Sequence, residues 1–288
     1  MDSTQITHRA LVIGSPIAHS LSPVLHNAGY EAAGLSGWEY TRAEVVESQV
    51  ADFVAGLGSE YRGISVTMPN KFAALALADE VTDRARVIGS ANTLVRLSED
   101  RWRADNTDTE GIVGALCQLC GVADQPALQG VLAGQRAVIV GGGGTARPAL
   151  WVLATLGVSH ITVLNRTDKR GGWNEIVASV NPLVELHWCD FSVSDTELEA
   201  VTRSAGVVIS TVPSAVISGR EVALAHAPVL DVIYDPRPTP LTRAAQMAGF
   251  PAVEGDVMLA HQAFSQFEQF TGQPAPREAM IAALQAVL

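Results

Sequence analysis

Short apolar runs alternate with amphipathic stretches along the chain, a pattern typical of βα units around a largely parallel sheet. The apolar runs predict strands at 10–14, 38–43, 62–67, 92–97, 136–141, 160–165, 185–188, 206–211, 229–233 and 252–254. The amphipathic stretches predict helices at 22–34, 47–57, 70–78, 109–120, 145–157, 169–180, 194–203, 219–225, 240–248, 256–271 and 276–287. The pattern therefore predicts an α/β protein.

The length of 288 residues suffices for two domains with separate cores. A turn-rich segment at 121–135 precedes the strand expected at 136–141 and marks the approach to a second domain. We place the boundary near residues 105–110, with the helix that begins at Thr109 connecting the two domains. We expect residues 1–108, joined by the C-terminal helices at 256–288, to form one mixed but mostly parallel α/β domain. Residues 109–255 would form the other.

Composition and charge argue against two classes of partner. The chain has 30 acidic against 19 basic residues and a net charge of -11, which argues against nucleic acid or an anionic membrane surface as the main partner.

No secretory signal and no apolar run of about 18 residues is visible, so we expect a cytoplasmic protein. Its three cysteines suit a reducing compartment. Cys117 and Cys120 form a C-x-x-C inside an expected helix, where packing is a better explanation than redox or metal chemistry. No spacing of His, Cys and Asp is convincing for a metal, so no metal is expected.

A glycine loop follows the strand expected at 136–141. Gly141, Gly143 and Ala146 satisfy G-x-G-x-x-G/A between a strand and a helix, the arrangement that brings a dinucleotide pyrophosphate to a helix N-terminus. The alternative is a glycine-rich turn that binds no ligand. The motif favours a Rossmann-type second domain.

The end of the next strand bears on the choice of cofactor. An acidic residue there usually binds the free ribose 2′-hydroxyl of NAD. This chain instead has Asn165, Arg166 and Thr167, followed by Lys169 and Arg170. Guanidinium and hydroxyl groups suit a 2′-phosphate, so NADP is favoured over NAD; a solvated basic turn is the alternative.

Uncharged hydrogen-bonding residues recur near expected strand ends and turns in the first domain and the C-terminal helices. Such groups suit a ligand with several hydroxyls or a carboxylate. Taken singly, each is more often a cap or turn residue, and Ser22 before Pro23 is a natural helix N-cap. The group comprises Ser20, Ser22, Thr67, Asn92 and Gln262.

Lys71 and Asp108 are the candidates for proton transfer. If they meet at a substrate hydroxyl, a charged lysine can protonate a ketone oxygen during hydride reduction, and the neutral amine can take the proton back. The carboxylate would orient the alcohol and hold the lysine. A surface ion pair is an equally good explanation at this point. His19 and His26 are weaker candidates for a general acid.

Eight ordered motifs resemble those of the shikimate dehydrogenase family over essentially the whole chain: GSPIAHSLSPVLHN, SVTMPNK, GSANT, DNTD, GGGGTA, NRT, DVIYDPRPTPL and GDVMLAHQ. The resemblance implies NADP-dependent reduction of 3-dehydroshikimate to shikimate in aromatic amino-acid biosynthesis. It also implies an open two-domain α/β fold with the active site in the cleft between the domains. Members of the family occur as monomers and as homodimers.

The resemblance also implies a role for each matching residue. Lys71 and Asp108 would be catalytic, and Ser20 and Ser22 would hold the substrate carboxylate. Groups near the substrate ring would be Thr67, Asn92, Asp108, Tyr234 and Gln262. NADP would be bound by Gly141, Gly142, Gly143, Gly144, Thr145, Asn165, Arg166, Thr167 and Arg170, with Val232, Gly255 and Met258 beside the nicotinamide and Asp83 approaching from the first domain. Gly142 departs from the family, which commonly has alanine there, and we expect it to loosen the turn slightly.

Three rival functions remain. A structural or scaffolding protein is the weakest, because it would have no use for Ser20, Ser22 and Lys71 together with a cofactor loop. An NAD-dependent quinate/shikimate dehydrogenase would share the N-terminal motifs but tend to carry an acidic residue after the second strand of the cofactor domain. A dehydrogenase-like sensor would keep the binding site and lose Lys71 or Asp108, and both are present.

Overall fold

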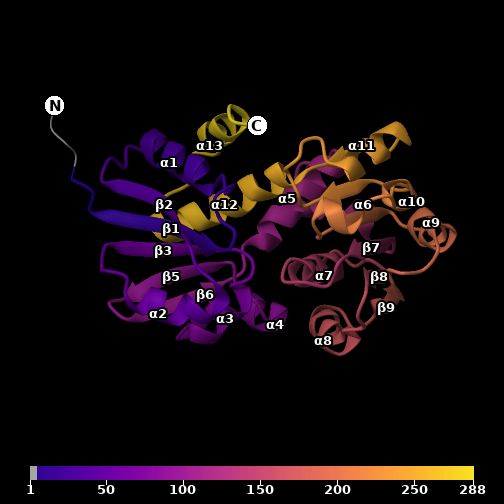
Figure 1. Cartoon of the computed structure of the whole chain (residues 1–288), viewed down its shortest axis with the longest axis horizontal. Coiled ribbons are helices and arrows are strands. Elements are labelled where there is room, and N and C mark those ends of the chain that lie inside the picture. The colour runs from indigo at the N-terminus through magenta and orange to yellow at the C-terminus, as the bar shows by residue number, and fades with distance from the viewer. Residues whose placement is uncertain (1–4) are drawn as a thin grey trace. The chain divides into compact units, whose positions relative to one another are not determined.

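The computed structural model of the protein describes residues 5–288, which form two compact α/β units (Figure 1). One unit is the chain up to Asp108 together with Leu259–Leu288, and the other is Thr109–Met258. Both boundaries coincide with helices, at the start of α5 (Asp108–Cys120) and inside α12 (Gly255–Thr271). The predicted fold class, a mixed, mostly parallel α/β domain plus a Rossmann-type domain, is confirmed.

The first unit contains a six-stranded mixed sheet in the order β2-β1-β3-β5-β6-β4. Strand β5 runs antiparallel to both of its neighbours, and the other pairs are parallel. The strands are β1 (His8–Gly14), β2 (Trp38–Glu44), β3 (Tyr61–Val66), β4 (Glu80–Val81), β5 (Thr93–Ser98) and β6 (Arg101–Asp105).

Helices cover both faces of this sheet. They are α1 (Ser22–Ala32), η1 (Glu47–Gln49), α2 (Val50–Ala55), α3 (Lys71–Leu77), α4 (Asp83–Ile88), the later part of α12 and α13 (Arg277–Gln285). Ala10 and Val12 of β1 pack with side chains of α1, α12 and α13, whereas Leu11 and Ile13 pack with those of α2 and α3. Because successive residues of a strand point to opposite faces, covering both faces explains the uninterrupted apolar run of β1.

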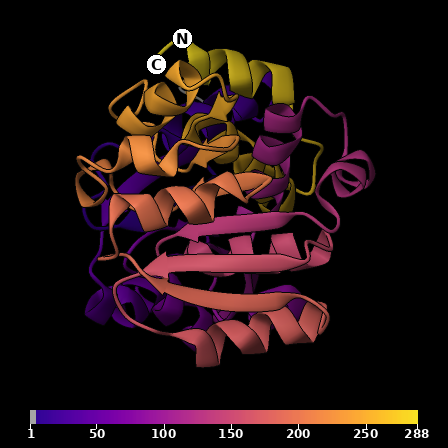
Figure 2. The same cartoon turned by 90° about the vertical axis from the view of Figure 1, so that its right-hand side faces the viewer.

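The second unit contains a wholly parallel sheet in the order β12-β11-β10-β7-β8-β9. Figure 2 shows strands of this sheet side by side with their arrowheads at one edge. The strands are β7 (Arg136–Val140), β8 (His160–Asn165), β9 (Glu185–Asp190), β10 (Val207–Ser210), β11 (Val229–Asp231) and β12 (Ala252–Val253).

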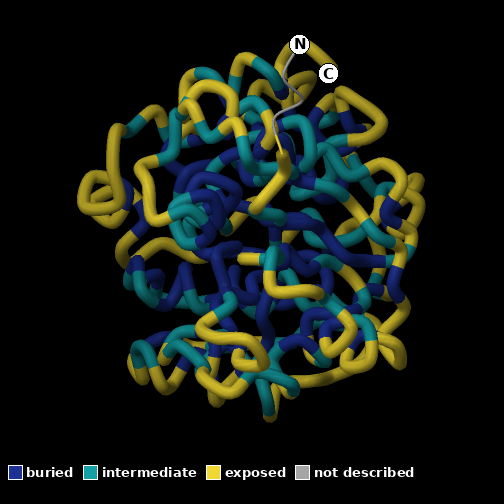
Figure 3. The backbone as a smooth tube through the Cα atoms, turned by 90° about the vertical axis from the view of Figure 1, so that its left-hand side faces the viewer, coloured by how far each residue is buried: buried dark blue, intermediate teal, exposed yellow. Residues whose placement is uncertain are grey.

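The helices of this unit are α5, α6 (Gln125–Leu132), α7 (Ala146–Thr155), α8 (Arg170–Val180), α9 (Asp195–Arg203), η2 (Ser214–Val216), α10 (Glu221–Leu224) and α11 (Pro240–Met247). Val138 and Val140 of β7 pack with side chains of α9, α10 and α11. Figure 3 shows the buried positions in the interior and the exposed ones in loops and outer helix surfaces. Among the described residues, no helix is both long enough and apolar enough to span a membrane.

The structure adds elements that the pattern did not predict, namely β4, β6, α4 and α6. Residues 121–135 were expected to be a turn-rich connection, yet α6 occupies most of them. Its N-cap Asp124 accepts a hydrogen bond from the Ala127 backbone at 2.9 Å, and Pro126 lies in the first turn, where a proline is tolerated. The expectation of a turn-rich connection throughout 121–135 is therefore wrong.

Candidate active site

The ends of three strands meet at one edge of the first sheet. Ser65 near the end of β3 pairs with Thr93 at the start of β5, and Thr93 pairs with Asp105 at the end of β6. The antiparallel direction of β5 therefore brings the segments after β3, before β5 and after β6 to the same place. These segments carry Lys71, Asn92 and Asp108.

Lys71 and Asp108 form a buried ion pair. Lys71 is the first residue of α3, Asp108 is the first residue of α5, and the lysine Nζ donates to Asp108 Oδ2. The two residues are only 8% and 5% exposed. The alternative of a solvated surface pair is therefore wrong.

Asn92 connects this pair to the last long helix of the first unit. Its Nδ2 donates to Asp108 Oδ1 at 2.9 Å and to Gln262 Oε1 at 3.1 Å, and its Oδ1 accepts from the Thr107 backbone at 2.7 Å. Both oxygens of Asp108 are thus occupied by donors. Lys71, Asn92, Asp108 and Gln262 form one hydrogen-bonded group.

A buried chain of hydrogen bonds lies next to this group. The Tyr40 hydroxyl donates to Ser65 Oγ at 2.6 Å, and Ser65 Oγ donates to Gln266 Oε1 at 2.7 Å. Gln266 Nε2 donates to Thr93 Oγ1 at 2.9 Å, and that hydroxyl donates to Asn92 Oδ1 at 2.8 Å. These hydrogen bonds hold the side-chain amide of Asn92 in one orientation. Sequence reasoning missed Tyr40, Ser65 and Gln266; the signal was a polar residue inside an apolar strand or helix face.

Ser22 lies at the Tyr40 end of this series of hydrogen bonds. Burial raises the pKa of Tyr40, and hydrogen bonding of its hydroxyl to Ser65 and Ser22 acts against that rise. Ser22 is the first residue of α1, and Leu21 occupies the N-cap position, so the expectation of a Ser22 N-cap is wrong. The Ser22 backbone N–H donates to Ser20 Oγ at 3.4 Å.

His26 is excluded as a general acid by its surroundings. It is fully buried, and its ring stacks on Tyr40 with a centroid distance of 4.2 Å. Burial lowers the pKa of His26 to about 3, so the ring is neutral near pH 7.

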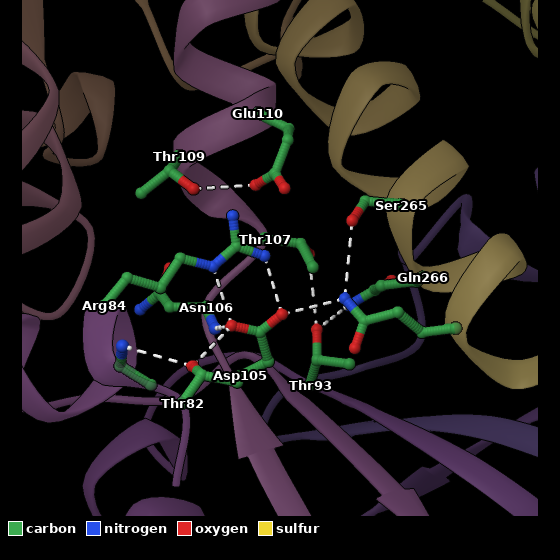
Figure 4. A network of polar contacts seen from close by, with 12 residues as sticks. Thr82, Arg84, Thr93, Asp105, Asn106, Thr107, Thr109, Glu110, Ser265 and Gln266 are labelled. Atoms are coloured by element: carbon green, nitrogen blue, oxygen red, sulfur yellow. Dashed lines mark hydrogen bonds and ion pairs between the residues drawn. The ribbon is translucent and has the colours of Figure 1, made fainter.

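Asp105, the first residue of the DNTD motif, holds the loop that leads to Asp108 (Figure 4). Arg84 Nε and Nη2 donate to its two oxygens at 2.7 and 2.6 Å, and Thr82 and Gln269 each add a bond, at 2.7 and 2.8 Å. Burial alone would raise the pKa of Asp105, but the hydrogen bonds and charge of Arg84, with the other donors, lower it to about 2. Sequence reasoning assigned no role to Asp105 or Arg84.

The glycine loop of the second unit follows β7 and leads into α7. Gly141 has a φ of +103°, and a Cβ there would lie 2.6 Å from Thr211 Oγ1 and Val212 Cγ1, so this position requires glycine. At Gly142 a Cβ would lie 2.5 Å from Trp173 Cζ2. The absence of a side chain at Gly142 therefore leaves room for Trp173, an explanation for this glycine that the sequence did not reveal.

The basic residues after β8 are engaged to different extents. Arg170 is held by Asp168, with Nη2 to Oδ2 at 2.6 Å, and its side chain and backbone lower the pKa of that carboxyl group. Lys169 Nζ lies 3.4 Å from the Gly142 carbonyl oxygen. Arg166 is exposed and makes no hydrogen bond or ion pair with the described residues. Of these cations, Arg166 is the most available to a ligand.

The chain matches two family models. Residues 12–94 match the shikimate dehydrogenase substrate binding domain, and residues 257–285 match the shikimate 5'-dehydrogenase C-terminal domain. A shikimate dehydrogenase (NADP(+)) of Methylobacterium radiotolerans is 39% identical, over 94% of this chain and 93% of that protein.

The chain belongs to the shikimate dehydrogenase family. Solved structures of family members share its fold. The shikimate dehydrogenase of Mycobacterium tuberculosis is 47% identical with a TM-score of 0.84, covering 97% of this chain and 99% of that one. A shikimate 5-dehydrogenase from Mycobacterium fortuitum is 46% identical with a TM-score of 0.81, covering 96% and 97%.

Not every residue predicted from the family motifs joins the Lys71 group. Thr67 follows β3, and its side chain makes no hydrogen bond with the described residues. Asp83 is exposed and pairs with Arg86 at 2.8 Å. Val232 and Tyr234 follow β11, and Gly255 begins α12 so close to the Val232 carbonyl oxygen that a Cβ would clash.

In the second unit, the residues predicted to bind NADP or lie beside its nicotinamide, together with Tyr234, share one edge of the sheet. They lie at or just after the carboxyl ends of β7, β8, β11 and β12, where ligands of open α/β sheets usually bind. The set is Gly141, Gly142, Gly143, Gly144, Thr145, Asn165, Arg166, Thr167, Arg170, Val232, Tyr234, Gly255 and Met258.

Proposed function

We propose that this chain is an NADP-dependent shikimate dehydrogenase, which reversibly reduces 3-dehydroshikimate to shikimate in the shikimate pathway. The observation that carries the proposal is the buried Lys71–Asp108 pair, bonded to Asn92 and through Asn92 to Gln262, in a member of this family. The relatives' name, shikimate dehydrogenase (NADP(+)), supports both the substrate and the cofactor.

Proton transfer is assigned to Lys71. The reduction adds one hydride to the carbonyl carbon and one proton to the carbonyl oxygen, and NADPH supplies the hydride when it is bound. The Lys71 ammonium gives its proton to the oxygen, which becomes the substrate hydroxyl, and the neutral amine regains a proton from solvent. In the reverse direction the neutral amine removes the hydroxyl proton.

Asp108 and Asn92 orient the reacting groups. Asp108 holds Lys71 through one oxygen while Asn92 fixes the other, so the lysine Nζ is kept in place without searching other rotamers. Ser20 and Ser22 are proposed to hold the substrate carboxylate. Hydroxyl contacts are assigned to Thr67, Asn92, Asp108, Tyr234 and Gln262.

The glycine loop suits a dinucleotide. The loop from Gly141 to Thr145 precedes the ten-residue helix α7, whose N-terminal N–H groups favour a pyrophosphate. Asn165, which ends β8, donates Nδ2 to the Thr167 carbonyl at 2.7 Å and so shapes the turn that carries Arg166. A guanidinium in that turn favours a 2′-phosphate over a free hydroxyl, which supports NADP.

Initial rates with shikimate or quinate, each with NADP or NAD, test the proposal. Fast turnover with shikimate and NADP is expected; comparable rates with quinate and NAD would favour the catabolic relative, and no turnover with any pair would favour the sensor.

The variant Lys71→Arg tests the proton transfer. It keeps a cation beside Asp108, but its guanidinium stays protonated, so we expect a loss of kcat of about 10²-fold or more in the oxidation of shikimate. The melting temperature should stay close to that of the parent. Substantial turnover by Lys71→Arg would mean that Lys71 only binds.

A further inference from the structure

Two histidines and a glutamate converge on an edge of the second sheet. His160 begins β8, Glu185 begins β9, and His187 lies two residues further along β9, so the three side chains share one face. His160 pairs directly with Glu185 in the strand register. Glu185 Oε2 lies 3.0 Å from His160 Nε2 and 3.4 Å from His187 Nε2, and all three candidate ligand atoms lie within 4.8 Å of one another.

The surroundings of His160 orient its ring toward this point. Ser159 Oγ donates its proton to the backbone carbonyl of Gly134 at 2.8 Å or Gln135 at 3.0 Å, so it accepts from His160 Nδ1 at 2.9 Å. With its proton on Nδ1, a neutral His160 presents a bare Nε2 lone pair to a carboxylate oxygen. Two lone pairs at 3.0 Å repel each other unless a cation or a proton lies between them.

We propose that His160, Glu185 and His187 bind one divalent transition-metal ion of the zinc class. With ligand bonds of about 2.1 Å, separations of 3.0 and 3.4 Å correspond to angles at the metal of about 90° and about 110°. Two imidazoles and a carboxylate are preferred zinc ligands.

Ser159 orients the His160 ring by accepting a hydrogen bond from its Nδ1, as oxygen acceptors do for imidazole ligands at known metal sites. An imidazole ligand usually donates its second N–H to an oxygen, which fixes the tautomer and turns the other nitrogen toward the metal. Side-chain exposures of 26%, 64% and 53% for His160, Glu185 and His187 leave room for water to complete the coordination.

The site belongs to a different edge from the predicted cofactor loop. His160 and Glu185 are the first residues of their strands, whereas the loops assigned to NADP follow the carboxyl ends of the parallel strands. A bound ion would link β9, which ends the sheet order, to β8. We therefore expect it to stabilise the second unit and to leave the hydride-transfer site unchanged. The expectation that the chain holds no metal site rested on sequence spacing, and the two histidines are far apart in sequence.

Calorimetric titration of the chelator-treated full-length protein with zinc chloride tests the proposal. We expect one ion per chain, a rise in melting temperature, and a visible d–d absorption band when cobalt(II) replaces zinc. His160→Ala, His187→Ala and Glu185→Gln should each weaken binding by about 10-fold or more. The matched control is His226→Ala, because His226 faces Glu199 at 3.8 Å without a second histidine.

Three outcomes would overturn the proposal. One is zinc binding no tighter than about 1 mM, the range of a weak surface contact. A second is tight binding that survives His187→Ala but is lost in Cys117→Ser, which would assign the ion to the C-x-x-C pair. His226→Ala should bind zinc like the parent, and a loss there equal to that of His187→Ala would count equally against the site.

Discussion

The ion pair between the partly exposed Arg84 and the buried Asp105 is expected to determine both the stability of the first unit and the position of the loop that carries Asp108. The pKa of Asp105 falls from 3.8 to about 2, although burial alone would raise it. This difference between the pKa values of the unfolded and folded states corresponds to about 2–3 kcal/mol of stability. Because the folded-state pKa is depressed, this stability is present above pH 3.8 and is lost as the pH falls from 3.8 toward about 2.

A double-mutant cycle measures this interaction. Arg84→Met keeps most of the aliphatic stem but leaves the buried carboxylate without its cation, and Asp105→Asn keeps the shape but removes the charge. We expect each single variant to lose about 2–4 kcal/mol in urea unfolding at pH 7, since breaking a buried pair leaves an uncompensated charge. The coupling energy should be about 2 kcal/mol. The control is Arg86→Met on the same helix, where an exposed pair with Asp83 should contribute about 0–1 kcal/mol.

The same variants test the link to catalysis. If Asp105 holds the segment leading to Asp108, Arg84→Met should lower kcat at saturating substrate while the protein remains folded. A coupling energy below about 0.5 kcal/mol would refute the stability argument. An unchanged kcat in a measurably destabilised Arg84→Met would refute the positioning argument.

Three further predictions concern other parts of the chain. His26→Phe should make the free energy of unfolding less dependent on pH between about pH 6.5 and 3. The pKa of His26 falls from 6.5 to about 3 on folding, so the stability that the neutral ring contributes above pH 6.5 is lost at about 1.4 kcal/mol per pH unit as the pH falls toward 3. An unchanged pH dependence of the unfolding free energy in urea titrations would contradict this prediction. Gly142→Ala should cost about 1–3 kcal/mol, because its Cβ would overlap Trp173, while Gly143→Ala, with open space, should leave the melting temperature unchanged; equal losses would show that packing is not the cause. Arg166→Ala should raise the KM for NADP far more than the KM for shikimate, and an unchanged KM for NADP would place the phosphate elsewhere.

Most elements were predictable because their cause is local. Each buried parallel strand is an apolar run with helices on both sides, and β7, for instance, carries that signature within a few residues. The missed elements depend on distant partners. The two-residue strand β4 exists because Glu80 and Val81 pair with β6, and β6 itself pairs with β5, so neither has a strong pattern of its own.

Part of the candidate site was also predictable, because some of its residues form short contiguous motifs. The glycine loop and the residues after β8 are contiguous motifs whose function depends on adjacent backbone. Lys71 and Asp108 could be identified individually from the sequence, but the sequence does not show whether the two residues form a buried or a solvent-exposed ion pair. Burial of the pair arises from the antiparallel β5, which gathers three separate segments at one edge.

The sequence alone therefore determined the α/β class, the order of most strands and helices, and the motifs that identify the family. Those features depend on short-range periodicity and on residue types at short spacing. Tertiary structure decided which polar side chains meet: Asp105 with Arg84, Gln266 with Thr93, and His160 with Glu185 across neighbouring strands. Side-chain networks of this kind depend on strand register and chain reversal over long sequence separations, and these are global properties of the packed chain.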